Sequence, residues 1–388
     1  MLKYFVYIII IFLSFINNLL AQQINNCEWD NRIGTPCITI SKTPNTSNVS
    51  EKSINKIIID KSSIQKSGAI DVIDVLKYID GIDLKQNGQK GQLASLFTRG
   101  TNSNHTLVLL NGIPINDQST TQGLHNFGQD FLQTIQQIEI YKGPNGAHFG
   151  PSAIGGAINF ITAIDYQNGI SVSGYNGKNN LIDTNFTKIF DKDLHINFKG
   201  SLSNNKNNSA RYGGVEEDSS KNYQLNLNTE KWLSDNLKIN STSYARRTKS
   251  NYDASSNDES GFAHDKMYVF QTNLSLLQSD SINTLSFHVH HYNREYDESG
   301  YFDWYKSQTA LIKGESKVNF SKNISYGYGA EYKYDSGSFT NSGSWSSPSA
   351  SGNIDNLSIF GNFGYQFLND TIFSFYLRGD NHKTTGTN

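Results

Sequence analysis

Three histidines lie close together in the sequence, at His288, His290 and His291. In an extended strand alternate side chains share a face, so His288 and His290 can act together whereas His291 points to the other side. Two neutral imidazoles on one face could bind a metal ion or the iron of a haem. The wet interior of a β-barrel also needs polar residues of this kind, and we favour that structural role.

Acidic side chains gather in two polar segments, 203–222 and 248–266, which we expect to be neighbouring loops. Carboxylates that converge from neighbouring loops suit a hard cation such as Ca²⁺, which takes six to eight oxygen ligands. A solvated acidic rim is the alternative. The acidic residues of the two segments are Glu216, Glu217, Asp218, Asp253, Asp258, Glu259 and Asp265.

No motif of the sequence predicts an enzyme. The chain has neither a serine nucleophile elbow nor an HExxH pair. A phosphate-binding loop would need a Lys-Ser or Lys-Thr pair after its glycines, and none follows Gly155 and Gly156. His105, His125 and His148 are scattered and support no site. The formal net charge of -2 shows no basic excess, so we do not expect nucleic acid as a partner.

Alternating strands must position most of these side chains. From residue 169 onward the sequence alternates apolar and polar residues over stretches of about ten, which is typical of strands with two different faces. Leu194, Ile196 and Phe198 share one face, for example, opposite His195 and Asn197. We expect about 11 such strands between residues 169 and 388.

The connections between these strands alternate in length. Turn-forming residues make the short ones, and the long ones are polar, an asymmetry typical of outer-membrane barrels with periplasmic turns and extracellular loops. A soluble β-sandwich or an adhesin is the alternative. The short connections are Asp191 to Asp193, Ser234 to Asn236, Ser279 to Ser281, Ser321 to Asn323 and Asn369 to Asp370, and the long ones are 203–222, 248–266, 294–307 and 335–355.

Composition agrees with a membrane barrel. The mean hydropathy of -0.50 and 18% charged residues exclude a helical membrane protein, yet the chain contains 21 Tyr and 22 Phe. At the N-terminus, Lys3 and the apolar run that follows it predict a signal peptide, residues 1–21. Cys27 and Cys37 follow it and could form a disulfide in an oxidising compartment, a question that the sequence leaves open.

Residues 51–165 predict a separate α/β domain, with a helical stretch from Ala69 to Ile79. Its motifs resemble, in order and at matching spacing, the plug of the TonB-dependent receptors. The resemblance implies an α+β plug domain inside a 22-stranded antiparallel transmembrane β-barrel. Residues 166–388 supply only about 11 strands, so the barrel is incomplete here. We therefore expect the chain to be an N-terminal fragment. The motifs are Asp74-Val75-Leu76, Gly81-Ile82-Asp83, Phe97-Thr98-Arg99-Gly100, Val108 to Asn116, Ile138 to Pro144 and Gly150 to Thr162.

Within that family, Gln86 to Phe97 and Arg99 to Asn102 most resemble the plug of cobalamin (vitamin B12) transporters. That likeness implies substrate contacts at the plug apex. The segment Ser250-Asn251-Tyr252-Asp253-Ala254 also resembles an extracellular loop of those transporters, which implies a substrate contact at Ala254 and calcium ligands at Tyr252 and Asp253. The implied substrate contacts are Leu93, Ser95, Asn102, Thr120, Thr121 and Ala254. The candidate calcium ligands are therefore Tyr252 and Asp253, by resemblance, and Glu216, Asp218 and Asp265, from the neighbouring acidic segments.

The segment between signal and plug, residues 22–50, contains Ile38, Thr39, Ile40 and Ser41, which resemble a TonB box. Such an extended stretch can be captured by a partner that adds a strand to it. The resemblance therefore predicts a transporter rather than an enzyme: it would lie in the bacterial outer membrane, contact its lipid, and take up a scarce large ligand with energy from TonB. Cobalamin is the ligand that we favour, with an iron siderophore or haem as the alternative, and a passive channel or adhesin outside the class.

Overall fold

The structure is a computed structural model of the whole chain. It describes residues 56–88, 90–120, 123–143, 146–162, 168–175, 179–190, 193–208, 217–253, 260–298, 301–342, 349–367 and 371–387. The predicted signal peptide, the predicted TonB box and both cysteines lie outside these ranges. Among the helices of the described residues, none has the length and apolar character needed to span a membrane.

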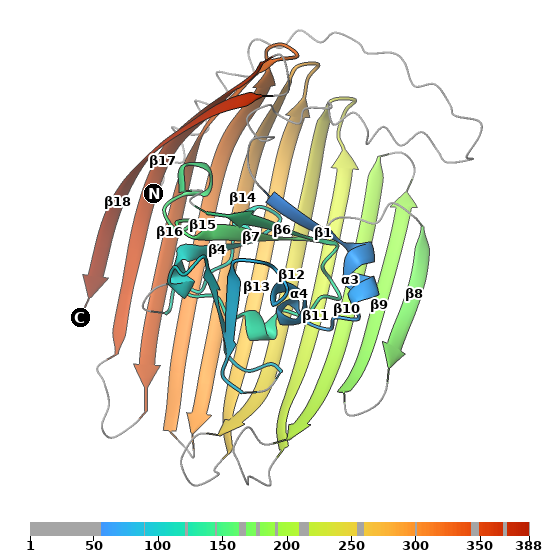
Figure 1. Ribbon diagram of the computed structural model, residues 1–388, viewed down its shortest axis with the longest axis vertical. Coiled ribbons are helices and arrows are strands. Elements are labelled where there is room, and N and C mark those ends of the chain that lie inside the picture. Colours follow the sequence, from blue (N-terminus) through green and yellow to red (C-terminus); the bar gives the residue numbers. More distant parts are fainter. Residues whose placement is uncertain are drawn as a thin grey trace.

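Residues 169–387 form one antiparallel sheet of 11 strands, in which each strand pairs with its neighbours in sequence (Figure 1). This confirms the predicted ladder of hairpins. The sheet runs from edge strand β8 to edge strand β18; the closed barrel of 22 strands stays a prediction. The strands are β8 Gly169–Tyr175, β9 Asn179–Phe190, β10 Leu194–Asn208, β11 Glu217–Trp232, β12 Leu237–Asp253, β13 Ser260–Leu277, β14 Ser281–Glu298, β15 Tyr301–Asn319, β16 Ile324–Asn341, β17 Ala350–Gln366 and β18 Ile372–Thr387.

The strands continue far into the segments predicted to be long loops, so those predictions were wrong in extent. Strands β10 to β18 have 15 to 19 residues, whereas about 9 to 11 suffice to cross a bilayer. Most of the extra residues are polar, and they keep strand pairing because backbone hydrogen bonds do not require apolar side chains. The predicted loops 203–222, 248–266, 294–307 and 335–355 shrink to connections 209–216, 254–259, 299–300 and 342–349.

The distribution of polar and apolar side chains over the two faces of the sheet is the reverse of that in a soluble protein. In β10, His195, Asn197 and Lys199 are buried against the interior, whereas Phe198 and Leu202 are exposed on the other face. The same outward exposure of apolar side chains recurs on β11, β13, β14, β16, β17 and β18. An apolar outer face with a polar inner face is the arrangement of a membrane-spanning barrel wall.

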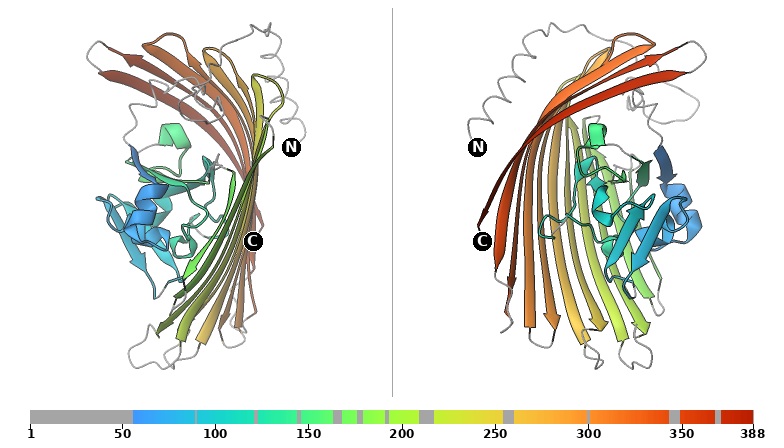
Figure 2. Two further views of the ribbon diagram at one scale, coloured as in Figure 1. Left: turned by 90° about the vertical axis from the view of Figure 1, so that its right-hand side faces the viewer. Right: turned by 60° about the vertical axis from the view of Figure 1, so that its left-hand side comes forward.

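The plug domain lies against the concave side of this sheet (Figure 2). Its main sheet has the strand order β1-β6-β7-β4-β5, and a two-stranded hairpin of β2 and β3 stands apart from it. All pairs are antiparallel except β4 with β7. The plug strands are β1 Lys56–Asp60, β2 Ile82–Gln86, β3 Ala94–Thr98, β4 Thr106–Leu110, β5 Ile113–Pro114, β6 Gln137–Lys142 and β7 Gly156–Ile161.

Short helices complete the plug: α3 Lys61–Ser67, α4 Val72–Leu76 and α5 Gly146–Phe149, with 3₁₀ turns η2 Ser103–His105 and η3 Phe127–Gln129. Helix α4 is shorter than the predicted stretch from Ala69 to Ile79. It starts late because the Asp71 carboxylate caps its N-terminus by accepting a hydrogen bond from the Asp74 N–H, at 2.8 Å. Val72 and Leu76 are fully buried, and each such side chain contributes about 1.5–3 kcal/mol.

Candidate functional site

The hairpin of β2 and β3 points its tip toward the extended ends of the barrel strands. At this tip the Gln92 side chain donates a hydrogen bond to the Asn251 backbone oxygen, at 2.6 Å. Gly91 lies against Ser220, so close that a Cβ would come within 2.4 Å of the serine Cβ. Both partners belong to the strand extensions next to the predicted extracellular loops, so this tip is the apex of the plug.

Two further plug elements hold the apex in shape. Lys90 reaches from the hairpin tip to helix α4, with its ammonium 2.6 Å from Asp71 and 2.8 Å from Asp74. On the other side, the Asn126 side chain accepts hydrogen bonds from the backbone N–H groups of Ala94 and Gly128, both at 3.0 Å. The apical backbone is therefore fixed by charged and polar contacts rather than left to solvent.

A second apical segment, residues 117–120, lies against the strand extensions of β15 and β16. Asp117 accepts a hydrogen bond from the Ser307 hydroxyl at 2.8 Å, and the Arg294 guanidinium lies 3.5 Å from its other oxygen. At Gly337 the wall has no side chain, and a Cβ there would come within 2.6 Å of the Gln118 backbone oxygen. The plug thus meets the wall at van der Waals distance.

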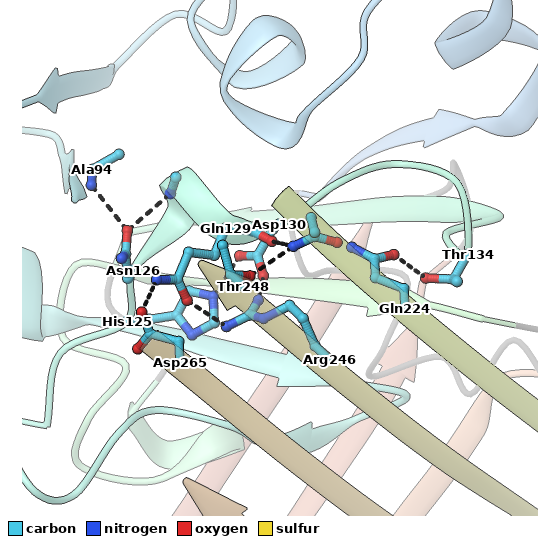
Figure 3. Close-up of polar contacts among 12 residues, drawn as sticks. Ala94, His125, Asn126, Gln129, Asp130, Thr134, Gln224, Arg246, Thr248 and Asp265 are labelled. Atoms are coloured by element: carbon cyan, nitrogen blue, oxygen red, sulfur yellow. Dashed lines mark hydrogen bonds and ion pairs between the residues drawn. The ribbon is translucent and has the colours of Figure 1, made fainter. Parts of the chain in front are cut away.

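The most buried polar cluster of the interface is centred on Arg246 of β12 (Figure 3). Its guanidinium binds the Asp130 carboxylate, and it donates hydrogen bonds to Gln129 Oε1 at 3.2 Å and to the Tyr292 hydroxyl at 2.8 Å. Asp130 in turn lies 2.5 Å from the His125 ring nitrogen Nε2. All five side chains are at least nine-tenths buried, so each charge depends on its partner.

The charge of Asp130 follows from this setting. Burial alone would raise the pKa of its carboxyl, but His125 and Arg246 outweigh burial and hold the pKa below its usual value. Asp130 is therefore ionised at neutral pH and forms a charged contact between plug and wall. Beside it, the Gln129 amide donates to Asp265 of β13, which links the same plug segment to a second strand.

A third group of contacts lies toward the short connections. Asn228 of β11 donates to the Thr162 backbone oxygen, and the Asn111 side chain donates to Thr242 of β12 at 3.2 Å. Gln271 of β13 donates to the Asn111 backbone oxygen at 3.3 Å. Polar contacts therefore join plug and wall along the length of the interface, with apolar packing confined mainly to Tyr244, Met267, Val269 and Tyr292.

Such an interface can be taken apart with little exposure of apolar surface. Water can replace most of its hydrogen bonds, each of which is worth about 0.5–1.5 kcal/mol net. The core of the plug itself is apolar and includes Val72, Leu96, Val108, Ile138 and Ile158. The arrangement is therefore suited to movement of the plug relative to the wall.

The residues predicted to contact substrate do not all lie together. Leu93 is 39% exposed at the apex, and Ser95 is half-buried on β3. Asn102 is exposed, but it follows β3 whereas Leu93 precedes it, so the strand separates them. The Thr120 hydroxyl donates to the Asp117 backbone oxygen at 2.9 Å and accepts from the Leu124 N–H at 2.7 Å, which shapes its own loop. Thr121 and Ala254 lie outside the described residues.

The candidate calcium ligands are also divided. The Tyr252 hydroxyl donates to Glu298 at 2.8 Å, Asp253 lies beside it at the end of β12, and Asp218 is buried. Asp265 pairs in register with Thr248, four residues before Tyr252 along β12, and its carboxylate accepts a hydrogen bond from Gln129. Within the described residues no group of three or more His, Cys, Asp or Glu side chains could hold a metal ion. Glu216 lies outside them, and the described ligands alone do not form a calcium site.

The structure places His288 and His290 on the inner face of β14, as the alternation predicts, and both are fully buried. Their ring centroids lie 6.2 Å apart. In the described part of the chain, no hydrogen bond reaches their ring nitrogens. His291 lies on the outer face, where its ring stacks on Tyr268.

Sequence reasoning missed the residues at the centre of the interface, namely His125, Gln129, Asp130, Arg246, Tyr292 and Arg294. His125 was judged to support no site, yet it contacts Asp130. One signal was present in the sequence: Arg246 lies at an alternate, inward position of its strand, between Tyr244 and Thr248. A charge at such a position needs a partner, but the sequence does not say which.

A plug packed by polar contacts inside an antiparallel, outwardly apolar wall defines a class of protein, the plugged outer-membrane barrels. Comparison with protein families agrees: residues 48–157 match the model of the TonB-dependent Receptor Plug Domain. This confirms the family resemblance of the plug, and the receptors of that family are outer-membrane β-barrel proteins, as predicted for this chain.

Solved structures share the fold of most of this chain. The ferric yersiniabactin uptake receptor FyuA from Yersinia pestis is 12% identical, with a TM-score of 0.65 over 88% of this chain and 62% of the receptor. The closed form of the ferric-catecholate import receptor Fiu from E. coli K12 is 13% identical, with a TM-score of 0.71 over 87% of this chain and 57% of Fiu.

The ferric citrate transporter FecA is 17% identical, with a TM-score of 0.66 over 86% of this chain and 60% of FecA. The chain thus spans between 57% and 62% of the length of these three receptors. At these identities the likeness establishes the fold.

Proposed function

We propose that the protein actively takes up a scarce, large ligand across the bacterial outer membrane, with energy supplied through TonB. The observation that carries the proposal is the position of the plug apex. The hairpin tip contacts Asn251 of β12, and the loop at residues 117–120 contacts Ser307 and Gly337, all on strand extensions next to the predicted extracellular loops. A ligand arriving from outside would meet the exposed Leu93 and the loop at residues 117–120 first.

The polar interface supports the transport step. Because the plug is joined to the wall mainly by hydrogen bonds and ion pairs, a pull on the plug can open a path without unfolding the wall. No residue of this chain supplies energy in the proposal, so the work comes from the partner that binds the N-terminal segment. The residues of this chain to which we propose that TonB binds are Ile38, Thr39, Ile40 and Ser41.

Cobalamin is the ligand that we propose, on the likeness of residues 86–102 to the plug of cobalamin transporters. A ferric chelate is the second candidate, because FyuA, Fiu and FecA are named for the uptake of ferric yersiniabactin, ferric catecholates and ferric citrate. Both are too large for diffusion pores. The proposed contacts are Leu93, Ser95, Asn102, Thr120, Thr121 and Ala254.

Ligand binding tests the proposal directly. Outer-membrane vesicles that contain the protein would be titrated with cyanocobalamin and, separately, with a panel of ferric siderophores and haem. Replacement of the apical Leu93→Arg should weaken binding at least tenfold, since a cation would occupy the contact surface. The matched control Ile58→Arg, on exposed strand β1, should leave binding unchanged. No binding of cyanocobalamin at micromolar concentration would exclude cobalamin, and no binding of any of these ligands would overturn the proposal.

Energy coupling has its own test. Deletion of residues 38–41 should abolish uptake of radiolabelled ligand by cells while leaving ligand binding to the cell surface intact. Uptake at the wild-type rate would refute coupling through this segment.

Calcium remains a proposal for the loops that contain Glu216, Asp218, Tyr252 and Asp253. Ligand titrations would be repeated with calcium at about 1 mM, which is on the order of the affinity of extracellular calcium modules, and again with a chelator. We expect the ligand to bind more tightly when calcium is present. Equal affinity under both conditions would argue against it.

A further inference from the structure

Two buried histidines of the wall have no part in the function proposed above. His288 and His290 lie on the inner face of β14, where they are 0% and 1% exposed, and their ring centroids are 6.2 Å apart. No hydrogen bond from the described residues reaches either nitrogen of either ring. Buried polar atoms nearly always have a partner, so these ring nitrogens call for water or for an ion.

An amide oxygen without a partner lies beside the pair. Gln271 of β13 is directly opposite His288 in the strand register, which places the two Cβ atoms about 4.5–5.5 Å apart. The Gln271 Nε2 donates a hydrogen bond to the Asn111 backbone oxygen of the plug at 3.3 Å. The Gln271 Oε1 is buried, and it accepts no hydrogen bond from any residue that the structure places. Two imidazoles and an amide oxygen therefore share one small part of the inner face.

The spacing of the two rings suits a shared metal ion. An imidazole nitrogen binds Zn²⁺ at about 2.0–2.1 Å, so two rings that share an ion have centroids at most about 6.4 Å apart. The separation between His288 and His290 is within this limit. Tetrahedral coordination needs centroids roughly 5 Å apart, and a small rotation about the side-chain bonds of either histidine can bring the rings that close.

The type of ligand selects a transition metal. Imidazole nitrogens suit Zn²⁺, Cu²⁺ and Ni²⁺, whereas Ca²⁺ and Mg²⁺ take oxygen ligands. Charges of both signs act on the pair. The carboxylates of Asp117 and Asp335 favour a positive charge at His290, and Arg246 and a protonated His125 oppose it. Coordination by neutral imidazole is therefore the main attraction that this part of the interface offers to a cation.

We propose that His288 and His290, with Gln271 Oε1 as a third ligand, bind one transition-metal ion such as Zn²⁺ or Cu²⁺ between the wall and the plug. The hydrogen bond from Gln271 to Asn111 means that the docked plug orients the amide ligand, as the outer partners of metal ligands do. An ion that binds better when the plug is docked stabilises docking in turn. The pair is buried away from the apex, so this ion belongs to the interface and is not the ligand that the protein transports.

Metal binding by the purified chain in detergent tests the proposal. The protein would be treated with a chelator, freed of it, and titrated with micromolar Zn²⁺ and, separately, Cu²⁺. After gel filtration, elemental mass spectrometry should find about one ion per chain in the wild type. His288→Gln/His290→Gln should weaken binding at least about tenfold, because it removes both imidazole ligands. Millimolar Ca²⁺ should not displace the ion.

The matched control is His264→Gln/His291→Gln, which removes one outward-facing histidine from each of the same two strands, β13 and β14. It should retain the ion like the wild type. Gel mobility with and without heating would verify that every variant folds. No retained ion in the wild type, equal retention in the two double variants, or displacement by Ca²⁺ would overturn the proposal.

A gain of affinity tests the third ligand, since misfolding cannot produce it. Gln271→Glu should bind Zn²⁺ more tightly than the wild type, because a charged carboxylate replaces the amide oxygen. Unchanged or weaker binding would overturn the assignment of Gln271 as a ligand.

Hydrogen–deuterium exchange tests the coupling between the ion and the plug. With Zn²⁺ at about ten times its Kd, exchange of plug residues 106–115 that is limited by undocking should slow by up to about tenfold. The same Zn²⁺ concentration should have no effect on His288→Gln/His290→Gln. Equal exchange of the wild type with and without the ion would overturn the coupling.

Discussion

Replacement of Arg246 by methionine should undock the plug without unfolding the wall. Methionine keeps most of the length of the side chain but removes its charge and its three contacts, to Asp130, Gln129 and Tyr292. Asp130 then stays buried with only His125 as a partner. Loss of one member of a buried ion pair costs about 3–5 kcal/mol, because the remaining charge is uncompensated.

The loss can be measured as a shift in the urea concentration at which the plug unfolds. Hydrogen–deuterium exchange of plug peptides from residues 126–135, followed through a urea series in micelles, reports plug unfolding separately from the wall. With a urea dependence of about 2 kcal/mol per M, the expected decrease in the midpoint is roughly 1.5–2.5 M. Wall peptides from β14 should show the same exchange in both proteins.

The adjacent arginine supplies a matched control. Arg247 lies one position along β12 but faces outward, so Arg247→Met should leave the plug midpoint unchanged. The double variant Arg246→Met/Asp130→Leu should recover part of the loss, since no orphan charge remains. If Arg246→Met and Arg247→Met gave the same midpoint, or if the double variant were worse than the single one, the ion pair would not hold the plug.

Two further predictions concern the same region. The pKa of Asp130 is held below its unfolded value, so the ionised carboxylate stabilises docking of the plug at neutral pH. This stabilisation should fall as the pH drops below about 4 and through the folded pKa. Hydrogen–deuterium exchange of the plug measured from pH 7 to pH 3 tests this, and an exchange profile that does not change with pH would contradict it. At Gly128, a Cβ would lie 1.7 Å from the Gln92 backbone oxygen, so Gly128→Ala should lower plug stability by about 1–3 kcal/mol. Gly146 has open space around it, so Gly146→Ala should leave plug stability unchanged. Equal thermal stability of the two variants would refute the steric clash expected at Gly128.

The strand ladder could be predicted because its signal is local. Each strand carries its own alternation, as in Leu194 to Lys199, and each hairpin partner is the next strand in sequence. The lengths of the strands could not be predicted in the same way. Residues 294–307 look like a loop because they are polar, but beyond the membrane both faces of a strand are wet, and polar residues pair there as well as apolar ones.

The partners across the interface could not be predicted, because their contacts are not local. Asp130 and Arg246 are 116 residues apart, and the residues near either one in the sequence do not indicate that the two form a pair. Asp265 illustrates the consequence: its acidic setting suggested a metal ligand, whereas the structure pairs it with Gln129 of the plug. Family resemblance pointed to the hairpin of β2 and β3, which the structure places against the strand extensions, but it could not specify which of its side chains support the loop rather than face a ligand.

Strand β1 has a mechanical consequence. It lies at the edge of the plug sheet, where β6 is its neighbour in register from Lys56 to Asp60, and its burial is partial along its whole length. A pull on the chain ahead of β1 acts first on this short edge strand, whose few hydrogen bonds can break in succession, and reaches β6, β7 and β4 only afterwards. The plug would thus yield in steps from one edge, at low force, while its apolar interior still resists.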